Sequence, residues 1–314
     1  MAIDPQVITT AVNDAYSRFA TATGGANASY IPYLASVPST LAGLAVVTVA
    51  GDVFKIGDTD YAFAIESLSK VFSLALALED VGPDEVHAKL GADPTGLPFN
   101  SVIALELHGD KPLSPLVNAG AMATVSLIKA ATADQRWARI LDIQSQLAGR
   151  EIKLSDALNQ SEQTTNFHNR GIAWLLYSAG TLYSDPMEAC EVYTRQCSTL
   201  ITTIDLATMG ATLASGGINP ISKTRVLTAA NVPHILAEMM MEGLYTGAGD
   251  WAYTVGLPGK SGVGGGILAV VPGVMAIAGF SPPLDDAGNS VRGQKMVAAV
   301  AKALGLNLYR VPGA

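Results

Sequence analysis

Residues 63–82 read FAIESLSKVFSLALALEDVG, a short strand-like run followed at once by a helical pattern. The segment from Ser67 to Asp80 is rich in Leu and Ala and contains neither Gly nor Pro, and Gly82 supplies a helix stop. Apolar residues occur all around the axis of this predicted helix, which is typical of a helix buried on every side. We therefore expect residues 67–80 to form a central helix of the molecule.

Strand-like segments lie on both sides of this helix in the sequence, towards the two ends of the chain. Residues 44–49 and 53–56 are separated by the turn pair Gly51-Asp52, which predicts a hairpin. A second hairpin is predicted for residues 267–271 and 274–280 on either side of Pro272-Gly273. Apolar residues at three- and four-residue spacing predict helices over 117–131, 137–147, 170–179, 186–200, 204–214, 232–245 and 297–304.

This order of elements predicts an α and β protein whose antiparallel sheet is built from both chain ends and flanked by helices. We expect residues 1–81 and 222–314 to form the sheet domain, and residues 82–221 to form an inserted all-helical domain. Because ligands commonly bind where two domains meet, the active site is expected in the cleft between them.

The composition excludes several classes of protein. Hydrophobic residues make up 49% and charged residues only 15% of the 314 residues, against an average of about 25% charged. Disorder is therefore excluded, and we expect a large core with further surface buried in a homo-oligomer, a dimer or a tetramer. The chain has 19 basic and 27 acidic residues, a formal net charge of −8, and no run of Lys or Arg. Nucleic acid, which needs a basic stripe, is excluded as a main partner.

Three features bear on where the protein works. Two cysteines, Cys190 and Cys197, are too few to staple a chain of this length, which favours a reducing compartment. Residues 1–5 lack the charged and apolar regions of a signal peptide. The longest apolar stretch, residues 266–280, is interrupted by Pro272-Gly273 and is too short to span a bilayer. We expect a cytoplasmic protein with no membrane partner.

Two segments match nucleotide-binding motifs only in part. Gly259-Lys260-Ser261 matches the end of a phosphate-binding loop, but Thr254 stands where that motif needs its first glycine. Residues 247–252 match a dinucleotide pattern loosely and do not follow a strand. The four histidines never fall at ligand spacing, and no Cys/His cluster exists. We expect neither a nucleotide cofactor nor a metal.

Ser67 and Lys70 open the predicted central helix. A spacing of three residues places them on one helix face, within reach of a hydrogen bond. A serine hydroxyl becomes a good nucleophile when a neighbour accepts its proton, and a lysine does so when burial or a second cation disfavours its charge. The helix N-terminus adds backbone N–H groups where an oxyanion would form.

The second candidate segment runs from Lys260 to Gly266, directly before a predicted strand. Lys260 is a candidate for the second cation that lowers the pKa of Lys70, and for holding an anionic group of a substrate. Gly262 and its neighbours allow backbone N–H groups to approach a carbonyl closely. Ser-x-x-Lys followed by Lys-Ser-Gly matches the pattern of serine acyl-transferases.

Together with further segments, these motifs closely resemble the serine-dependent glutaminases, which share the β-lactamase/transpeptidase fold. The resemblance runs from about Tyr30 to Lys295. The segments that carry it are residues 30–32, 63–70, 98–101, 117–121, 161–162, 169–170, 192–198, 214–220, 255–266 and 288–293.

The resemblance implies a reaction and a role for each matching residue. The reaction is hydrolysis of L-glutamine to L-glutamate and ammonia through an acyl-enzyme, without a metal or an organic cofactor. Ser67 would be the nucleophile, Lys70 its proton acceptor, and the N–H groups of Ser67 and Val263 the oxyanion hole. Tyr245 would help to pass protons to the leaving ammonia. The residues implied to hold the amino-acid end of glutamine are Tyr30, Asn118, Glu162, Asn169 and Tyr193.

The chemistry of a free amino acid agrees with these roles. An ammonium group needs an acid such as Glu162, and a carboxylate suits the amide and phenol donors of Asn118, Asn169 and Tyr193. Glu162 and Asn169 are seven residues apart, so a continuous helix would place them on one face, two turns apart.

Glu66 departs from the family pattern, because many members carry Gln before the nucleophile. An ionised Glu66 near Lys70 would raise the pKa of that lysine, which is the wrong direction for a base. We therefore expect Glu66 to face elsewhere or to be held by other donors. Two alternatives stay open: an acyl-transferase acting on peptides or β-lactams, and a non-catalytic amino-acid-binding relative.

Overall fold

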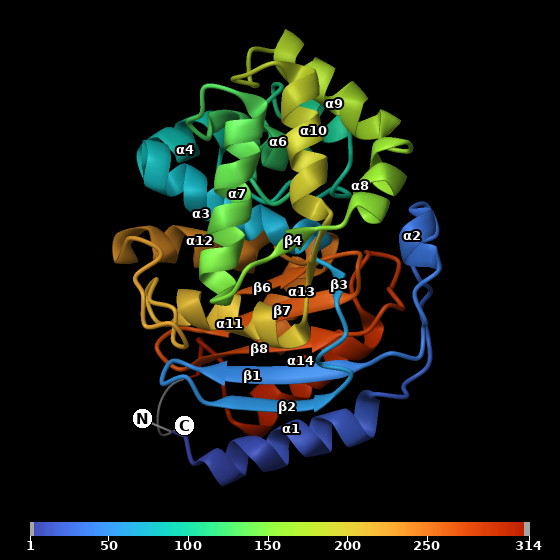
Figure 1. Ribbon diagram of the computed structural model, residues 1–314, viewed down its shortest axis with the longest axis vertical. Coiled ribbons are helices and arrows are strands. Elements are labelled where there is room, and N and C mark those ends of the chain that lie inside the picture. Colours follow the sequence, from blue (N-terminus) through green and yellow to red (C-terminus); the bar gives the residue numbers. More distant parts are fainter. Residues whose placement is uncertain (1–2, 311–314) are drawn as a thin grey trace.

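Strand β1 (Gly43–Thr48) is an inner strand of the main sheet, and all six of its residues are buried. The computed structural model describes residues 3–310. In it, β1 pairs with β2 (Val53–Gly57) on one side and with β8 (Met275–Phe280) on the other. Strands β7 (Gly266–Val271) and β6 (Gly259–Ser261) complete a five-stranded antiparallel sheet of order β2-β1-β8-β7-β6 (Figure 1). Both predicted hairpins are present, and the sheet joins strands from the two ends of the chain, as expected.

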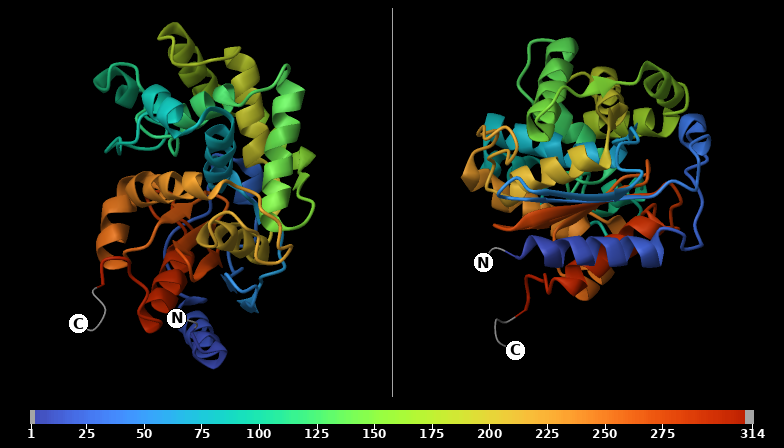
Figure 2. Two further views of the ribbon diagram at one scale, coloured as in Figure 1. Left: turned by 90° about the vertical axis from the view of Figure 1, so that its left-hand side faces the viewer. Right: turned by 60° about the horizontal axis from the view of Figure 1, so that its bottom comes forward.

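The two faces of the sheet are covered by different helices. Because side chains alternate across a strand, Leu44 and Val46 of β1 face one side, where α1 (Pro5–Phe19) and α14 (Val291–Ala303) pack. Ala45 and Val47 face the other side, where α11 (Thr203–Ala214) packs. Figure 2 shows α1 and α14 beneath the sheet, and α11 with the helices of the preceding segment above it.

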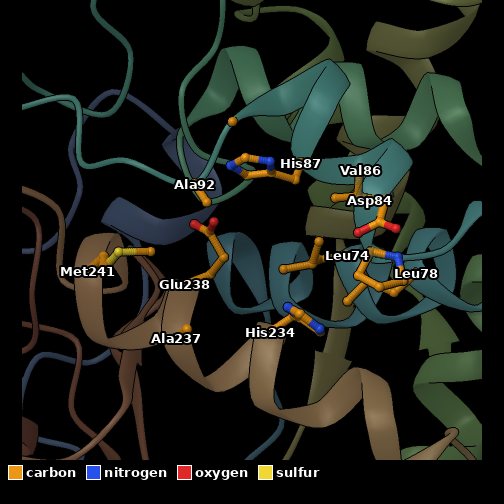
Figure 3. A pocket seen from close by; sticks show the side chains of 12 residues that line it. Leu74, Leu78, Asp84, Val86, His87, Ala92, His234, Ala237, Glu238 and Met241 are labelled. Carbon is orange, nitrogen blue, oxygen red and sulfur yellow. The ribbon is translucent and has the colours of Figure 1, made fainter.

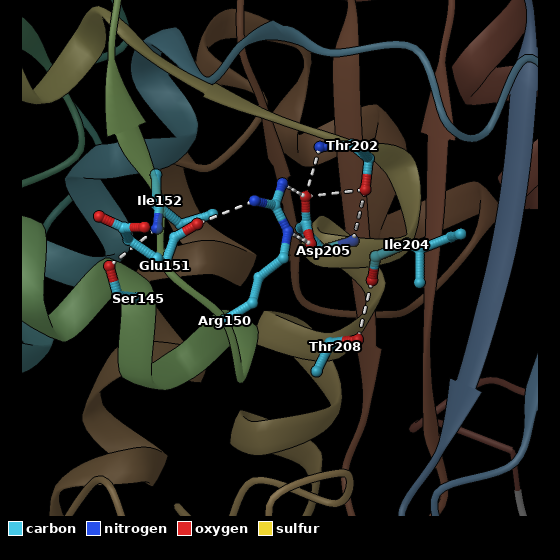
Figure 4. Close-up of polar contacts among 8 residues, drawn as sticks. All are labelled: Ser145, Arg150, Glu151, Ile152, Thr202, Ile204, Asp205 and Thr208. Carbon is cyan, nitrogen blue, oxygen red and sulfur yellow. Dashed lines mark hydrogen bonds and ion pairs between the residues drawn. The ribbon is translucent and has the colours of Figure 1, made fainter.

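Helix α11 lies directly on the sheet, although it belongs to the segment 82–221 that we expect to form a helical domain. Its first turn is closed by a capping box, in which Asp205 N–H donates to Thr202 Oγ1 (3.1 Å) and Thr202 N–H to Asp205 Oδ2 (2.7 Å). Arg150, just after α7 (Ala133–Ala148), donates from Nε to Asp205 Oδ1 at 2.6 Å (Figure 4). This contact joins the end of α7 to α11.

A cluster of helices lies above α11 and around α3 (Ser69–Val81) (Figure 1). Besides α7 it contains α4 (Pro83–Leu90), α5 (Ile103–Leu107), α6 (Asn118–Leu127), α8 (Asp156–Gln163), α9 (Phe167–Ser178) and α10 (Pro186–Cys197). The helix predicted over 186–200 ends at Cys197, because Thr199–Ile201 form strand β5. In that strand the β-branched residues pair with β3 (Phe63–Ala64) and β4 (Lys153–Leu154).

Two further helices lie between α11 and strand β6 in the sequence. The predicted helix over 232–245 is shorter, as α12 (Val232–Glu242), and α13 (Ala248–Thr254) follows a short 3-10 turn at Tyr245–Gly247. A single helical turn, α2 (Pro32–Ala35), lies between α1 and the sheet in the sequence. None of the helices within residues 3–310 is long and apolar enough to cross a membrane.

The predicted central helix is confirmed. A 3-10 turn at Glu66–Leu68 leads into α3 (Ser69–Val81), which ends at Gly82 with a φ of +82°. Every residue from Ser69 to Leu78 is buried, because α3 packs against α6, α7 and α12. Strand β3, which belongs to the small sheet β3-β5-β4, ends just before the turn, and the turn contacts β6 and β7 of the five-stranded sheet. Ser67 and Lys70 therefore lie between that sheet and the helices.

Candidate active site

Ser67 and Lys70 are brought together at the start of α3. The Lys70 Nζ donates a hydrogen bond to Ser67 Oγ at 3.0 Å, as the spacing of three residues predicts. Lys70 is fully buried and Ser67 is only 6% exposed. The hydroxyl and the amine are therefore in direct contact and shielded from bulk water.

The surroundings of Lys70 favour its neutral form. Burial lowers the pKa of Lys70 from 10.5 to about 8, although nearby Cys197 and Glu66 act in the opposite direction. Its other hydrogen bond goes to Asn118 Oδ1 at 2.7 Å. The rings of Phe99, Tyr193 and Tyr245 surround the amine, with centroids 5.6–5.8 Å from Nζ.

The glycine turn after β6 lies against the backbone that carries Ser67. A Cβ added at Gly264 would lie 2.2 Å from the Ala64 carbonyl oxygen, so only glycine permits this approach. A Cβ at Gly262 would lie 3.4 Å from the Leu68 nitrogen. Val263, between these glycines, is thereby held beside the turn that contains Ser67.

A cavity of about 350 Å³ adjoins the dyad at Asn118, which accepts the Lys70 hydrogen bond, although neither Ser67 nor Lys70 lines it. The residues that line it include Tyr30, Phe99, Asn118, Glu162 and Asn169. Four of the five residues expected at the amino-acid end of a substrate therefore share one cavity. The fifth, Tyr193, lies behind Asn118 and donates from its hydroxyl to Asn118 Oδ1 at 3.1 Å.

The amides of this cavity are oriented by one another. Asn118 Nδ2 donates to Asn169 Oδ1 at 3.0 Å, and the Asn118 backbone N–H donates to the Phe99 carbonyl at 2.8 Å. Asn118 starts α6, while Asn169 belongs to α9. Glu162 and Asn169 do not share a continuous helix, because α8 ends at Gln163 and α9 begins at Phe167. They face the same cavity from two helices.

Glu66 pairs with the Glu162 carboxyl and still lies close enough to Lys70 for the two groups to influence each other's pKa. Burial and the neighbouring Glu162 carboxyl raise the pKa of Glu66 well above its usual range. Burial also raises the pKa of Glu162 to about 7, while hydrogen bonds from Ser198 and Glu66 act to lower it. Glu66 is thus the protonated partner that donates to Glu162. Its φ of +49° is rare for a residue with a side chain and costs local strain.

Tyr245 lies between the two lysines. Its ring centroid is 4.1 Å from Lys260 Nζ and 5.6 Å from Lys70 Nζ, and its ring packs on Phe99. The Tyr245 hydroxyl is buried without a hydrogen-bond partner among residues 3–310. Like Glu66, Tyr245 has a positive φ, +56°.

Lys260 is fully buried and donates to the carbonyls of Gly243 (3.0 Å) and Ser261 (2.6 Å). Burial and the charge of Lys70 lower its pKa well below the usual range. The charge of Lys70 thus disfavours that of Lys260, whereas the lowered pKa of Lys70 is caused by burial. The hydrogen bonds of Lys260 go to the backbone, and it does not belong to the lining of the 350 Å³ cavity.

Comparison with known proteins identifies the family. The family described as Glutaminase matches residues 25–309. Glutaminase 1 of Escherichia coli K12 is 71% identical over 98% of this chain and 99% of its own length. A glutaminase of Bordetella avium is 72% identical, with the same coverage. A solved structure described as "Probable glutaminase ybaS" superposes with a TM-score of 0.98 at 70% identity, and covers 98% of this chain and 100% of that one. The chain belongs to the glutaminase family.

Three residues of this glutaminase-family site were not assigned a role from the sequence. Phe99 lines the cavity and packs on Tyr245, although its segment was part of the resemblance. Ser198 donates to Glu162 Oε1 at 2.9 Å. Glu242 lies close enough to both lysines for its charge to act on them. Phe99 and Ser198 stand within quoted family segments, whereas Glu242 carries no sequence signal.

A second cavity, of about 630 Å³, adjoins the first in this glutaminase-family chain. It shares Tyr30 and Phe99 with the first cavity and reaches Val263. Within the part of the chain that the structure describes, no group of three His, Cys, Asp or Glu side chains is arranged to hold a metal ion. Cys190 and Cys197 are both free and buried in the hydrophobic core.

Proposed function

We propose that Ser67 is the nucleophile and Lys70 the proton acceptor in hydrolysis of the side-chain amide of L-glutamine. Membership of the glutaminase family assigns the overall reaction, glutamine and water to glutamate and ammonia. The observation that carries the assignment of the dyad is the 3.0 Å contact between Lys70 Nζ and Ser67 Oγ in a buried site. Burial keeps much of Lys70 uncharged near pH 8, as a general base requires.

The reaction proceeds in two halves. Lys70 takes the hydroxyl proton as Ser67 Oγ attacks the amide carbon of glutamine, which gives a tetrahedral oxyanion. The N–H groups of Ser67 and Val263 stabilise this oxyanion. The C–N bond then breaks, a proton passes to the nitrogen, and ammonia leaves an ester on Ser67. Water attacks the ester, Lys70 accepts a proton from that water, and glutamate leaves as Ser67 regains its proton.

Tyr245 is proposed as the group that passes the proton to ammonia. Its hydroxyl is buried beside the dyad and has no competing partner among residues 3–310. Lys260 is proposed to act on the dyad through charge, because two amines near one ring keep each other from being fully protonated. It also holds the ring of Tyr245 by a cation–π contact.

The 350 Å³ cavity is proposed to bind the amino-acid end of glutamine. Glu162 would pair with the ammonium group, and the amides of Asn118 and Asn169 would donate to the carboxylate. Tyr193 keeps Asn118 in place through its 3.1 Å hydrogen bond. Tyr30, which is 58% exposed, stands at the entrance shared by the two cavities.

We further propose that the fold is of the β-lactamase/transpeptidase type, with residues 82–221 as the helical domain, although α11 packs on the sheet. We also propose a homo-oligomer, a dimer or a tetramer, in the cytoplasm. Exposed apolar side chains such as Phe167 (71%) and Trp174 (52%) on α9 support an interface there.

The experiment compares Ser67→Ala with Ser73→Ala. Ser73 is a second buried serine of α3, and its hydroxyl donates only to backbone carbonyls. Ammonia release from glutamine is expected to vanish in Ser67→Ala and to persist in Ser73→Ala. Rapid quenching of the wild type with glutamine should show a γ-glutamyl ester on Ser67 by peptide mass analysis. Substantial activity of Ser67→Ala would refute the dyad, and preferential hydrolysis of a chromogenic β-lactam would point to the alternative acyl-transferase.

A further inference from the structure

A third cavity lies away from the active site, between α3, α4 and α12. Its volume is about 310 Å³, at the lower end of the range for small-molecule sites. Leu74 and Leu78 of α3, Val86 of α4 and Met241 of α12 form apolar walls (Figure 3). None of the residues assigned to glutamine hydrolysis lines it.

One carboxyl group stands inside this apolar cavity. Glu238 of α12 is only 6% exposed, and its carboxylate points into the space below His87 and Ala92 (Figure 3). Ser114 Oγ donates to Glu238 Oε2 at 2.8 Å. Glu238 forms no ion pair with any residue from 3 to 310.

The charges around Glu238 are of the same sign. Burial raises the pKa of Glu238 to about 8, and the neighbouring Glu242 and Asp93 act in the same direction. His87 and His234 are exposed at the rim, where a ring nitrogen of either can accept a hydrogen bond. Glu242 and Asp93 lie close enough to disfavour an anionic ligand in the cavity, whereas a bound cation would favour the ionised form of Glu238 over its protonated form.

We propose that this cavity binds a small organic ammonium ion. The ammonium group pairs with the Glu238 carboxylate, and the hydrocarbon part lies against Leu74, Leu78 and Met241. Both parts of the ligand are needed, because the cavity offers one buried acid and otherwise mainly apolar surface.

The position of the cavity links it to the two helices that support the dyad. Lys70 lies one turn before Leu74 on α3. Helix α12 leads directly into Gly243, whose carbonyl accepts the Lys260 ammonium at 3.0 Å. A ligand in the cavity therefore contacts the helices that hold both lysines.

Calorimetric titration of the whole chain with butylammonium chloride tests the proposal. We expect one site per chain, with weaker binding of 1-butanol, which lacks the charge, and of ammonium chloride, which lacks the hydrocarbon part. Glu238→Gln should weaken butylammonium binding about tenfold or more, because a charged hydrogen-bond partner is lost. Glu85→Gln is the matched control, since Glu85 lies on α4 and pairs outward with Lys89 at 3.3 Å.

Two further variants separate this cavity from other sites. Ala237→Phe places a ring in the cavity from an exposed position on α12, and is expected to abolish binding without unfolding the chain. Glu162→Gln, which changes only the active site, should leave it intact. Equal binding of 1-butanol and butylammonium, or binding that survives both Glu238→Gln and Ala237→Phe, would overturn the proposal. So would loss of binding in Glu162→Gln alone.

Discussion

Replacement of Lys70 by methionine separates the catalytic role of the amine from its cost to the fold. Methionine has a similar length and no charge, so it suits a position surrounded by the aromatic side chains of Phe99, Tyr193 and Tyr245. Asn118 Oδ1 loses the Lys70 hydrogen bond but keeps the one from Tyr193. Ser67 Oγ also loses the hydrogen bond that Lys70 donates at 3.0 Å, so its hydroxyl is the one buried group whose donor is removed without replacement among the partners of Lys70.

Removal of the Lys70 amine is expected to change both the reaction rate and the stability of the fold. Loss of a general base removes about 10²- to 10⁴-fold of the rate. The difference between the ordinary pKa of 10.5 and about 8 in the folded chain corresponds to about 3 kcal/mol of lost stability at pH 7. Below pH 8 this cost is fully present, because the lysine is charged in both states. Between pH 8 and 10.5 the folded state has released the proton and the unfolded state has not, so stability rises with pH and the cost disappears.

Ammonia release and urea unfolding at pH 7 and pH 10.5 measure the two effects. Lys70→Met should lose activity at both pH values, and should gain up to about 3 kcal/mol of stability at pH 7 but almost none at pH 10.5. Lys153→Met is the control, since Lys153 is 75% exposed. More than a tenth of wild-type activity in Lys70→Met would refute its role as the base. A stability gain that is independent of pH would refute the argument from burial.

The pair formed by Glu66 and Glu162, and the cap of α11, give three more predictions. Glu66→Gln should keep activity at low pH and retain it to higher pH than the wild type, because Gln donates to Glu162 without the proton that Glu66 loses as pH rises; an unchanged pH profile of kcat/KM would contradict this. Glu162→Gln should raise KM much more than it lowers kcat, since the ammonium group of glutamine loses its partner. Steady-state kinetics measures both constants, and an unchanged KM would contradict this role of Glu162. Asp205→Ala should lower the free energy of unfolding by about 1 to 2 kcal/mol, because the capping box and the Arg150 contact are lost. Urea unfolding of Asp205→Ala measures this loss. Asp60→Ala, which removes an exposed ion pair with Lys55, is the control. An equal loss of free energy of unfolding in the two variants would show that the capping box adds no stability of its own.

Local patterns were sufficient for the elements that frame the site. Apolar, β-branched runs on either side of Gly51-Asp52 and Pro272-Gly273 predicted both hairpins, because such turns depend on only a few neighbouring residues. The spacing of Ser67 and Lys70 predicted their hydrogen bond, because a helix places residues three apart on one face. The quoted family segments also contain most of the residues that line the 350 Å³ cavity.

Contacts between segments that are far apart in the sequence could not be predicted from local patterns. The end of the predicted helix at 186–200 became strand β5, because β3 and β4 were there to pair with it. The break after Gln163 could not be read from the spacing of Glu162 and Asn169, since the helical period runs through both. Glu66 seemed to oppose the mechanism until the fold placed Glu162 against it.

By itself, the sequence determined that a serine and a lysine share a helix turn between two hairpins, because those relations depend on neighbours along the chain. Only the tertiary structure decided how the charges are distributed. Packing of α6, α7 and α12 around α3 removes water from Lys70, Glu162 of α8 gives Glu66 a carboxyl partner, and Glu238 lies in an apolar cavity without an ion-pair partner among residues 3–310. The physical reason is that the energy of a buried charge is set by the groups that surround it in space.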